Sequence, residues 1–248
     1  MSGAERIVFG FHSVLARLRA DPKSVLEVFL DETRKDARAK DFAVQVERAG
    51  ARLMRVPASR LEGMAGGGRH QGVVARVEAN TQKQTLEELL EALQVPALLL
   101  VLDGITDPHN LGACLRVANA AGAHAVIAPK DHAAGINATV SKVASGAAEI
   151  TPYFMVTNLA RTLADLKDRN IWIVGMDSSA PENLFSVKDL PTSVAWVLGA
   201  EGSGMRRLTR ESCDLLVRIP MGGAVESLNA SVAAGICLFE SVRRRAKK

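Results

Sequence analysis

Between residues 97 and 198, short apolar runs of strand length alternate with longer segments of helical periodicity. The first run, ALLLVLDG at 97–104, is apolar at successive positions, which is typical of a strand buried on both faces of a parallel sheet. Similar runs lie at 125–128, 152–156, 171–175 and 194–198, and helical patterns lie between them at 111–121, 137–147 and 159–169. The alternation predicts an α/β fold, with a mostly parallel sheet covered by helices on both faces.

A smaller α/β unit is expected before it, over residues 1–78. Its helical patterns lie at 10–20 and 37–49, and its β-like segments at 24–30, 51–56 and 71–78. The glycine-rich stretch 63–68 is expected to be a mobile loop rather than a helix interior. A polar, unpatterned stretch begins at residue 79, so we place a linker at 79–96, with a short helix at 86–93, and a second domain at 97–248.

The net charge of +4 is distributed unevenly along the chain. Residues 1–80 contain 14 Lys or Arg against 10 Asp or Glu, residues 81–240 contain 12 against 17, and the last eight contain five basic residues and no acid. A basic front unit and a basic tail suit contact with nucleic-acid phosphates, although a solvated surface with a frayed tail explains the same charge equally well. Aromatic residues make up only 4%, which disfavours a base-stacking platform.

Several classes of protein are disfavoured. No apolar run reaches the length of a membrane span, and no secretory leader is evident, so we expect a cytoplasmic protein that does not bind membranes. The three cysteines are far apart, and the five histidines have no metal-site or triad spacing. We therefore expect no disulfide framework and no metal.

In a parallel sheet the ligand site lies at the carboxyl ends of the strands, and the loop after residue 102 is the first to search. Either Asp107 or Asn110 can cap the helix that follows, and Arg116 is the only charge in that helix. Arg116 either pairs with Asp103 or Asp107 as a structural ion pair, or meets a phosphate or a reacting hydroxyl.

Two further loops are rich in polar or small residues. The sequence GAEGSG at 199–204 follows an apolar strand, and its spacing fits neither a dinucleotide-binding fingerprint nor a nucleotide P-loop. A second apolar segment, 215–220, ends in another glycine pair. Farther on, Ser227 is expected to cap the last helix, which leaves Asn229 in the first turn without an evident structural reason.

Together these segments resemble the SpoU (TrmH) class of SPOUT RNA 2′-O-ribose methyltransferases. The resemblance rests on three ordered motifs over residues 97–248, which read NLGxxxR from Asn110, LGAEGxG from Leu198, and IPM from Ile219 with SLNxSxA from Ser227. In addition, GFHSVLARL from Gly10 and HQGVVARVE from His70 are similar to the small substrate-binding domain of such enzymes, which resembles ribosomal protein L30e.

The resemblance implies a fold, a cofactor and an assembly. The carboxyl-terminal domain would form a deep trefoil knot, preceded by the L30e-like domain at 1–78, and the active site would lie at a homodimer interface. S-adenosylmethionine would be held by residues of the knot loops: Gly199, Ile219, Met221 and Leu228.

The implied reaction is 2′-O-methylation of a guanosine in the peptidyl-transferase loop of 23S rRNA, with free rRNA or a pre-ribosomal particle as partner. Arg116 would be the central catalytic residue, and Asn110, Glu201, Ser227 and Asn229 would position the arginine, the ribose or the cofactor. A tRNA guanosine 2′-O-methyltransferase and an RNA-binding assembly factor without activity are the alternatives.

Overall fold

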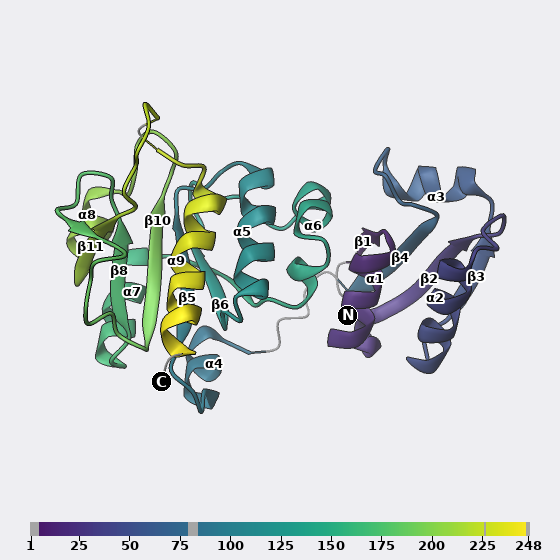
Figure 1. Ribbon diagram of the computed structural model, residues 1–248. Coiled ribbons are helices and arrows are strands. Elements are labelled where there is room, and N and C mark those ends of the chain that lie inside the picture. Colours follow the sequence, from purple (N-terminus) through teal and green to yellow (C-terminus); the bar gives the residue numbers. More distant parts are fainter. Residues whose placement is uncertain (1–4, 79–83, 226, 247–248) are drawn as a thin grey trace. The chain divides into compact units, whose positions relative to one another are not determined.

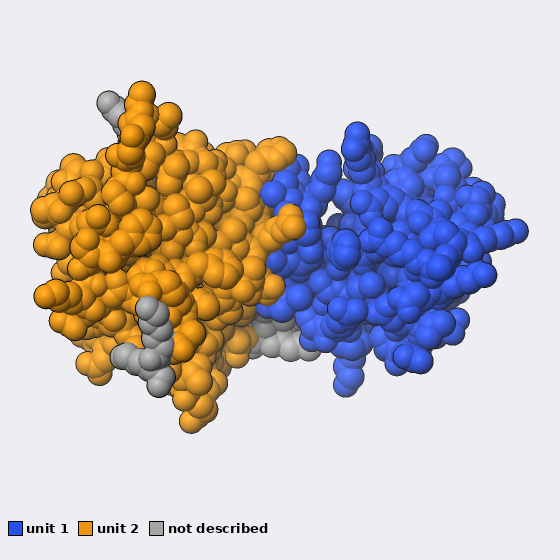
Figure 2. Space-filling model, viewed as in Figure 1, with its two compact units in different colours: residues 1–83, 136–150 blue, residues 84–135, 151–248 orange. Residues whose placement is uncertain are grey.

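The computed structural model describes residues 5–78, 84–225 and 227–246. It consists of two compact units: residues 1–83 with 136–150, and residues 84–135 with 151–248 (Figure 2). Residues 79–83 of the expected linker lie outside the described part, and its remainder contains α4 (Leu86–Ala92). The division from sequence did not foresee that 136–150 would group with the first unit.

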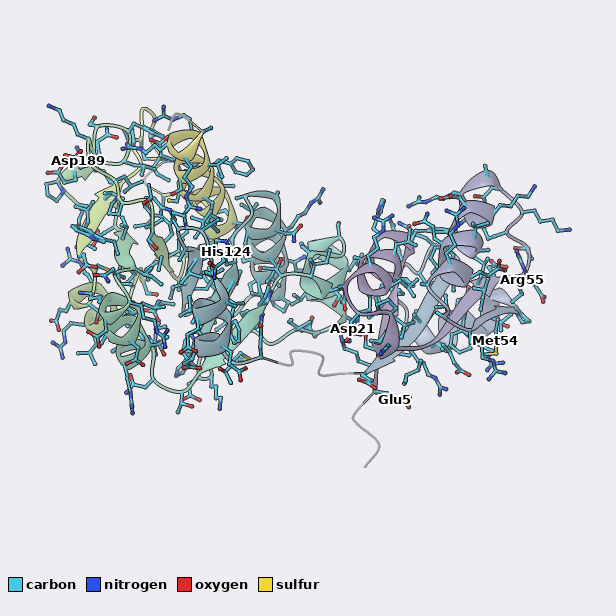
Figure 3. All side chains as sticks on the ribbon, turned by 90° about the horizontal axis from the view of Figure 1, so that it is seen from below. Glu5, Asp21, Met54, Arg55, His124 and Asp189 are labelled. Atoms are coloured by element: carbon cyan, nitrogen blue, oxygen red, sulfur yellow. The ribbon has the colours of Figure 1, made fainter. Side chains whose placement is uncertain are left out.

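The first unit is built on a four-stranded sheet in the order β1-β4-β2-β3 (Figure 1). Its strands are β1 (Glu5–Phe9), β2 (Val25–Asp31), β3 (Leu53–Val56) and β4 (Val73–Glu78). β2 and β3 pair in parallel, and the other pairs are antiparallel. Its helices are α1 (Phe11–Ala20), α2 (Ala37–Arg48) and α3 (Ala58–Ala65), with a 3-10 turn at Pro22–Ser24. Met54 and Arg55 lie on the edge strand β3 (Figure 3).

The expected loop at 63–68 is partly wrong, because α3 continues to Ala65 and contains Gly63. Leu61 and Ala65 are buried against the sheet, so packing offsets the low helix propensity of one glycine. The helix ends where Gly66 takes a left-handed conformation, φ 55°, which glycine adopts readily. β1 was not predicted from the sequence either. Its five residues are too few to show a strand pattern, and only its pairing with β4 identifies it as a strand.

The segment 136–150 belongs to this unit through a buried ion-pair cluster. It contains α6 (Ala138–Ala144) and a 3-10 turn (Ala147–Glu149), so the helix is shorter than the expected 137–147. The Glu149 side chain is fully buried, and its Oε2 accepts from Arg6 Nη2 and, at 3.4 Å, from Arg17 Nη1. A buried carboxylate requires such partners, and they come from β1 and α1.

The second unit contains a seven-stranded sheet in the order β7-β6-β5-β10-β8-β11-β9. Every pairing in it is parallel, as expected. The strands are β5 (Leu98–Asp103), β6 (Ala125–Pro129), β7 (Tyr153–Val156), β8 (Trp172–Met176), β9 (Glu182–Asn183), β10 (Val194–Gly199) and β11 (Leu215–Arg218). All six residues of β5 are buried, which confirms the interpretation of its apolar run.

Helices cover both faces of this sheet (Figure 1). On one face α4 and α7 (Leu159–Asp168) pack against alternate residues of the central strands. On the other lie α5 (Pro108–Ala120) and α9 (Ala230–Arg245), where the buried Trp196 donates from Nε1 to Ser241 Oγ at 2.8 Å. The short helix α8 (Arg207–Glu211) precedes β11. None of the helices over the described ranges is long and apolar enough to cross a membrane.

The structure settles how the helices around the predicted site begin. Asp107 caps α5, accepting from the backbone N–H groups of His109 and Asn110 at 3.2 and 3.1 Å. The expected cap at Ser227 is wrong: Asn229 is the N-cap of α9, and its Oδ1 accepts from Ser231 N at 2.9 Å. Sequence reasoning placed the start of α9 too early, so Asn229 was read as part of the helix.

The described part of the basic tail has structural contacts instead of a free surface. Arg243 and Arg244 both bind the Glu240 carboxylate, with each Nε 2.7 Å from a carboxylate oxygen. Arg245 Nη2 donates to Ala97 O at 2.7 Å. Arg244 also donates from Nη1 to Lys188 O at 3.2 Å, so Arg244 and Arg245 join α9 to neighbouring segments, whereas Arg243 binds within the helix. Lys247 and Lys248 lie outside the described residues.

Candidate active site

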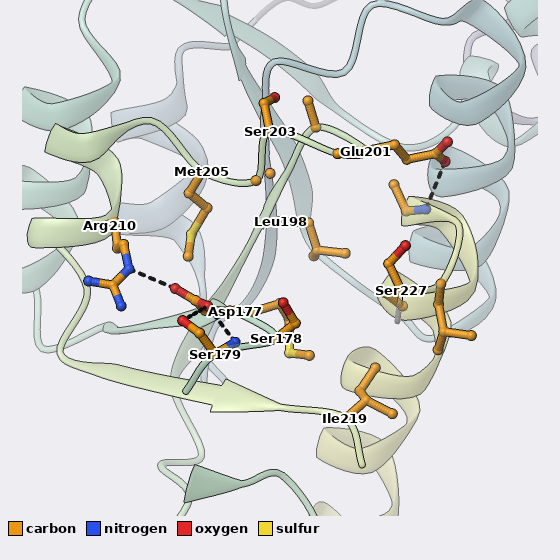
Figure 4. A pocket seen from close by; sticks show the side chains of 18 of the residues that line it. Asp177, Ser178, Ser179, Leu198, Glu201, Ser203, Met205, Arg210, Ile219 and Ser227 are labelled. Atoms are coloured by element: carbon orange, nitrogen blue, oxygen red, sulfur yellow. Dashed lines mark hydrogen bonds and ion pairs between the residues drawn. The ribbon is translucent and has the colours of Figure 1, made fainter. Parts of the chain in front are cut away.

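The carboxyl ends of β8 and β10 meet the loop after β11 around a pocket of about 550 Å³ (Figure 4). Four predicted cofactor residues line it, namely Gly199, Ile219, Met221 and Leu228. Of the five predicted catalytic residues, Glu201 and Ser227 line it too. Three segments far apart in the sequence therefore surround one pocket, at the sheet edge that the alternation predicts.

The loop after β10 is compact because glycine permits a close approach of two backbone segments. Ala200 N donates to Gly204 O at 3.1 Å, and Gly204 N donates back to Ala200 O at 2.9 Å. A Cβ at Gly199 would overlap the backbone of Gly204 and Met205. Glycine at position 199 is thus a steric requirement of this loop.

A buried carboxylate holds the far end of the same loop. The Asp103 side chain has no exposed surface and accepts from Arg206 N at 2.8 Å and from Arg206 Nε at 2.6 Å. Asp103 lies beside Gly199 in the β5/β10 register. The loop is therefore anchored at both ends. The alternative in which Arg116 pairs with Asp103 or Asp107 is wrong, because Asp103 binds Arg206 and Asp107 caps α5.

Glu201 joins the three predicted motifs through a single oxygen. Its Oε1 accepts from Asn110 Nδ2 at 3.0 Å, from Asn229 Nδ2 at 2.7 Å and from Ala230 N at 3.2 Å. Asn229 Nδ2 also lies 2.7 Å from Asn110 Oδ1. Hydrogen bonds to a charged acceptor are stronger than neutral ones. This network therefore positions α5, the loop at 199–205 (the Gly199 loop) and the start of α9 together.

Ser227 and Arg116 lie apart from that network. Ser227 is exposed, lines the pocket, and has no side-chain hydrogen bond within the part of the chain that the structure describes. Arg116 is exposed on α5, does not line the pocket, and forms no ion pair or hydrogen bond with the described residues. The structure brings Asn110, Glu201 and Asn229 together, but it does not bring Arg116 to the pocket of its own chain.

A polar cluster that sequence reasoning missed lines another side of the pocket (Figure 4). Asp177, directly after β8, accepts from Ser179 N at 2.8 Å and Ser179 Oγ at 2.6 Å, and its Oδ2 accepts from Arg210 Nε at 2.6 Å. Burial disfavours ionisation of Asp177, but the hydrogen bonds from Ser179 and Arg210 outweigh burial and lower its pKa. The position of Asp177 directly after a strand of the parallel sheet was the sequence signal that could have identified it as a candidate site residue.

Cys114 on α5 is fully buried and close enough to Glu201 to be affected by its charge. Burial raises the pKa of the Cys114 thiol on α5 to about 12, and the Glu201 carboxylate adds to that shift. A thiol with such a pKa is protonated at neutral pH and does not act as a nucleophile.

Over the described ranges, no group of three or more His, Cys, Asp or Glu residues is placed to hold a metal ion.

The pocket suits a small-molecule ligand with an apolar part and a positive charge. Its volume lies within the range of small-molecule sites, roughly 300–1,000 Å³. Leu198, Ile219 and Leu228 supply apolar surface, and the Glu201 carboxylate supplies negative charge. Gly202 and Gly204 have no neighbouring atom where a Cβ would stand, so a ligand can approach the backbone closely. These features fit S-adenosylmethionine.

Two family models match the chain. Residues 97–239 match the SpoU rRNA methylase family, and residues 7–83 match the model described as RNA 2′-O ribose methyltransferase substrate binding. The first match includes all the residues that line the pocket, and the second lies within the first unit.

Relatives and solved structures agree with these matches. The chain is 58% identical over 240 residues to the 23S rRNA (guanosine-2′-O-)-methyltransferase RlmB of Bordetella pertussis, covering 97% of this chain and 98% of the relative. It is 55% identical to the enzyme of the same name from Neisseria meningitidis, covering 98% and 97%. The SpoU methyltransferase AviRb from Streptomyces viridochromogenes, solved with AdoMet, superposes with a TM-score of 0.80 at 25% identity, covering 98% and 91%. The chain belongs to the SpoU rRNA methylase family.

Proposed function

We propose that this protein transfers a methyl group from S-adenosylmethionine to the ribose 2′-oxygen of a guanosine in 23S rRNA. The observation that supports this most directly is the network around Glu201 Oε1, which joins Asn110 and Asn229 at the rim of a cofactor-sized pocket. Relatives that cover nearly the whole chain are named for this activity. The target guanosine would lie in the peptidyl-transferase loop, in free rRNA or in a pre-ribosomal particle in the cytoplasm.

When bound, S-adenosylmethionine supplies an electrophilic methyl group on a positively charged sulfur. Gly199, Ile219, Met221 and Leu228 would hold it in the pocket, with the Gly199 loop close to it because that loop has little side-chain bulk. The Glu201 carboxylate would favour a nearby positive charge over a neutral product. Much of the rate would come from alignment of the 2′-oxygen with the methyl group.

Arg116 would act on the hydroxyl as a cation and not as a base. A guanidinium stays protonated in proteins, so it cannot accept the 2′-hydroxyl proton. It can bind the adjacent phosphate and lower the pKa of the hydroxyl, with phosphate or water accepting the proton. Its lack of a partner among the described side chains leaves its guanidinium available for this contact. Ser227 and Asn229 would orient the ribose.

A homodimer would explain why Arg116 lies away from the pocket of its own chain. α5 and α9 lie side by side, as Val117 Cγ1 lies 3.6 Å from the position of a Cβ at Gly235, and α9 exposes Val232 and Phe239 by 50% and 48%. An exposed apolar face of this kind suits a second copy of the chain. In that dimer Arg116 would reach the partner's pocket.

On the basis of the family, the proposal also includes a knotted fold and separate roles for the two domains. The segments after β10 and β11 would form a deep trefoil knot, which would account for both of them lining one pocket with the start of α9. Residues 1–78 would form an L30e-like domain that binds the RNA substrate, 79–96 would be a linker, and 97–248 would be the catalytic domain. The match to the substrate-binding model supports that role for the front unit.

The test is methyl transfer to defined RNAs. The protein is incubated with labelled S-adenosylmethionine and with unmethylated 23S rRNA, a pre-ribosomal particle or tRNA, and 2′-O-methyl positions are mapped. We expect one guanosine in 23S rRNA to be labelled. Transfer to tRNA alone would reassign the substrate, and cofactor binding without transfer to any RNA would favour an assembly factor that has lost its activity.

A further inference from the structure

A second cavity lies at the same edge of the catalytic sheet. It has a volume of about 290 Å³ and opens after the carboxyl ends of β6 and β7, beside α8. We propose that it binds one nucleotide of the RNA substrate next to the target, through a phosphate held by Arg206 and Arg207. The inference rests on the proposed function, and it names a substrate contact outside the cofactor pocket.

Consecutive residues of the chain line the cofactor pocket and the second cavity. Gly204 and Met205 line the cofactor pocket, and Arg206 and Arg207 line the second cavity. The buried Asp103 holds Arg206 through its backbone N and its Nε. A phosphate bound here would therefore lie at a fixed place relative to the Gly199 loop, which is a requirement for aligning a neighbouring ribose.

The donors on this side of the cavity are available. Asp103 occupies only Nε of Arg206, and neither Nη atom has a partner among the residues that the structure describes. Arg207 uses Nη1 alone, 2.8 and 3.0 Å from the two oxygens of Glu211, in a pair whose side chains are 76% and 55% exposed. Exposed pairs of this kind contribute little, so a phosphate can compete for Arg207. Two guanidinium groups match the geometry of phosphate oxygens.

The rest of the lining suits a nucleotide rather than a free phosphate. Pro129, Leu159 and Leu208 supply apolar surface, and Leu208 is 56% exposed. A sugar or base face can cover that surface while the phosphate meets the arginines. The single carboxylate of the lining is Asp131. The negative charge of Asp131 repels a phosphate, so removing that charge should strengthen RNA binding. The cavity can therefore be tested with one variant that weakens RNA binding and with one that strengthens it.

The experiment measures the affinity of the full chain for a 23S rRNA fragment over a range of salt concentrations. Arg207→Gln is compared with Arg169→Gln, which removes the same charge from another exposed pair, that of Arg169 with Glu91. We expect Arg207→Gln to weaken RNA binding by about three- to tenfold and to reduce the slope of log K against log salt by about 0.7–0.9, the value for one phosphate contact. Arg169→Gln should change neither quantity.

Two further readouts make the result specific. The Kd for S-adenosylmethionine should be unchanged in Arg207→Gln, because Arg207 does not line the cofactor pocket, while the KM for RNA rises. Asp131→Asn should bind RNA more tightly than the unaltered protein. Equal affinities and equal salt slopes for Arg207→Gln and Arg169→Gln would overturn the inference. A failure of the unaltered protein to methylate 23S rRNA would instead reject the proposed reaction, so the two failures are distinguishable.

Discussion

At the residue scale, the candidate site is held together by polar side chains that share one hydrogen-bond acceptor. Asn110, Glu201 and Asn229 were chosen from sequence as site residues, but the shared acceptor, Glu201 Oε1, is visible only in the structure. Asn229 has two roles: its Oδ1 caps α9 and its Nδ2 binds Glu201. Local pattern suggested Ser227 for the capping role, because cap propensity cannot distinguish two suitable residues two positions apart.

Replacing Glu201 tests this network. In Glu201→Ala the Asn110 amide and the backbone N–H of Ala230 lose their acceptor, and the Asn229 amide keeps only Asn110 Oδ1. We therefore expect kcat/KM to fall by about 10- to 100-fold, since a hydrogen bond to a charged group contributes about 1.5–3 kcal/mol. Glu201→Gln retains an acceptor oxygen and should keep more activity. The measurement is methyl transfer to 23S rRNA, with thermal unfolding as the control for folding. Equal losses in the two variants would show that charge, and not the shared acceptor, is what the site requires.

At the scale of elements, most strands and helices follow from the sequence. Apolar runs predicted β5, β6, β8 and β10 to within one or two residues, because each is long enough to show its own pattern. β1, β9 and α8 were not predicted: they contain five, two and five residues, too few for a period to emerge. Such elements are stabilised by their neighbours.

The Gly199 loop allows a steric prediction. A methyl group at position 199 would overlap the backbone of Gly204 and Met205, so Gly199→Ala should distort the loop at a cost of about 1–3 kcal/mol and weaken cofactor binding by about tenfold or more. Calorimetry with S-adenosylmethionine measures the affinity. Gly222→Ala is the matched control, because a Cβ there meets no atom within 4 Å. A Gly199→Ala protein with unchanged affinity would contradict the close approach.

The end of α9 allows a prediction about acid stability. Hydrogen bonds from Arg243 lower the pKa of Glu240 to about 2, against burial and with the help of Arg244. The folded state therefore binds fewer protons than the unfolded state between pH 4.5 and 2, so the stabilisation by Glu240 is complete above pH 4.5 and is lost as the pH falls toward 2. We expect Glu240→Gln to lower the free energy of unfolding by about 1–3 kcal/mol at pH 7.

Urea unfolding of both proteins at pH 7 and pH 3 measures this difference. It should be largest at pH 7 and smaller at pH 3. A difference that is independent of pH would mean that packing of the side chain, and not its charge, stabilises the end of the helix.

At the scale of the whole molecule, the proposed dimer predicts complementation between inactive variants. Arg116→Ala should abolish transfer with cofactor affinity nearly unchanged, because Arg116 does not line the pocket of its chain. Asn229→Ala should also lose activity. If Arg116 acts across the dimer, a heterodimer of the two variants has one complete site, formed by the pocket of the first chain and Arg116 of the second.

Mixing the two variants under conditions that exchange subunits should thus restore activity, up to about a quarter of the unaltered level if subunits redistribute at random, since half the dimers would then be heterodimers with one intact site each. Methyl transfer before and after mixing is the measurement, and light scattering gives the oligomeric state. No recovery from a verified heterodimer would place Arg116 in its own chain's site.

The α/β class, the parallel sheet, the sheet edge of the candidate site and the motifs that resemble the family follow from the sequence alone. These depend on periodicity and on short spacings, which a linear chain displays directly. Only the folded chain shows the Glu201 network, the Asp177–Arg210 pair, the internal contacts of the basic tail and the grouping of 136–150 with the first unit. Each joins residues that are distant along the chain, or depends on a packed environment, and local sequence preference does not encode that information.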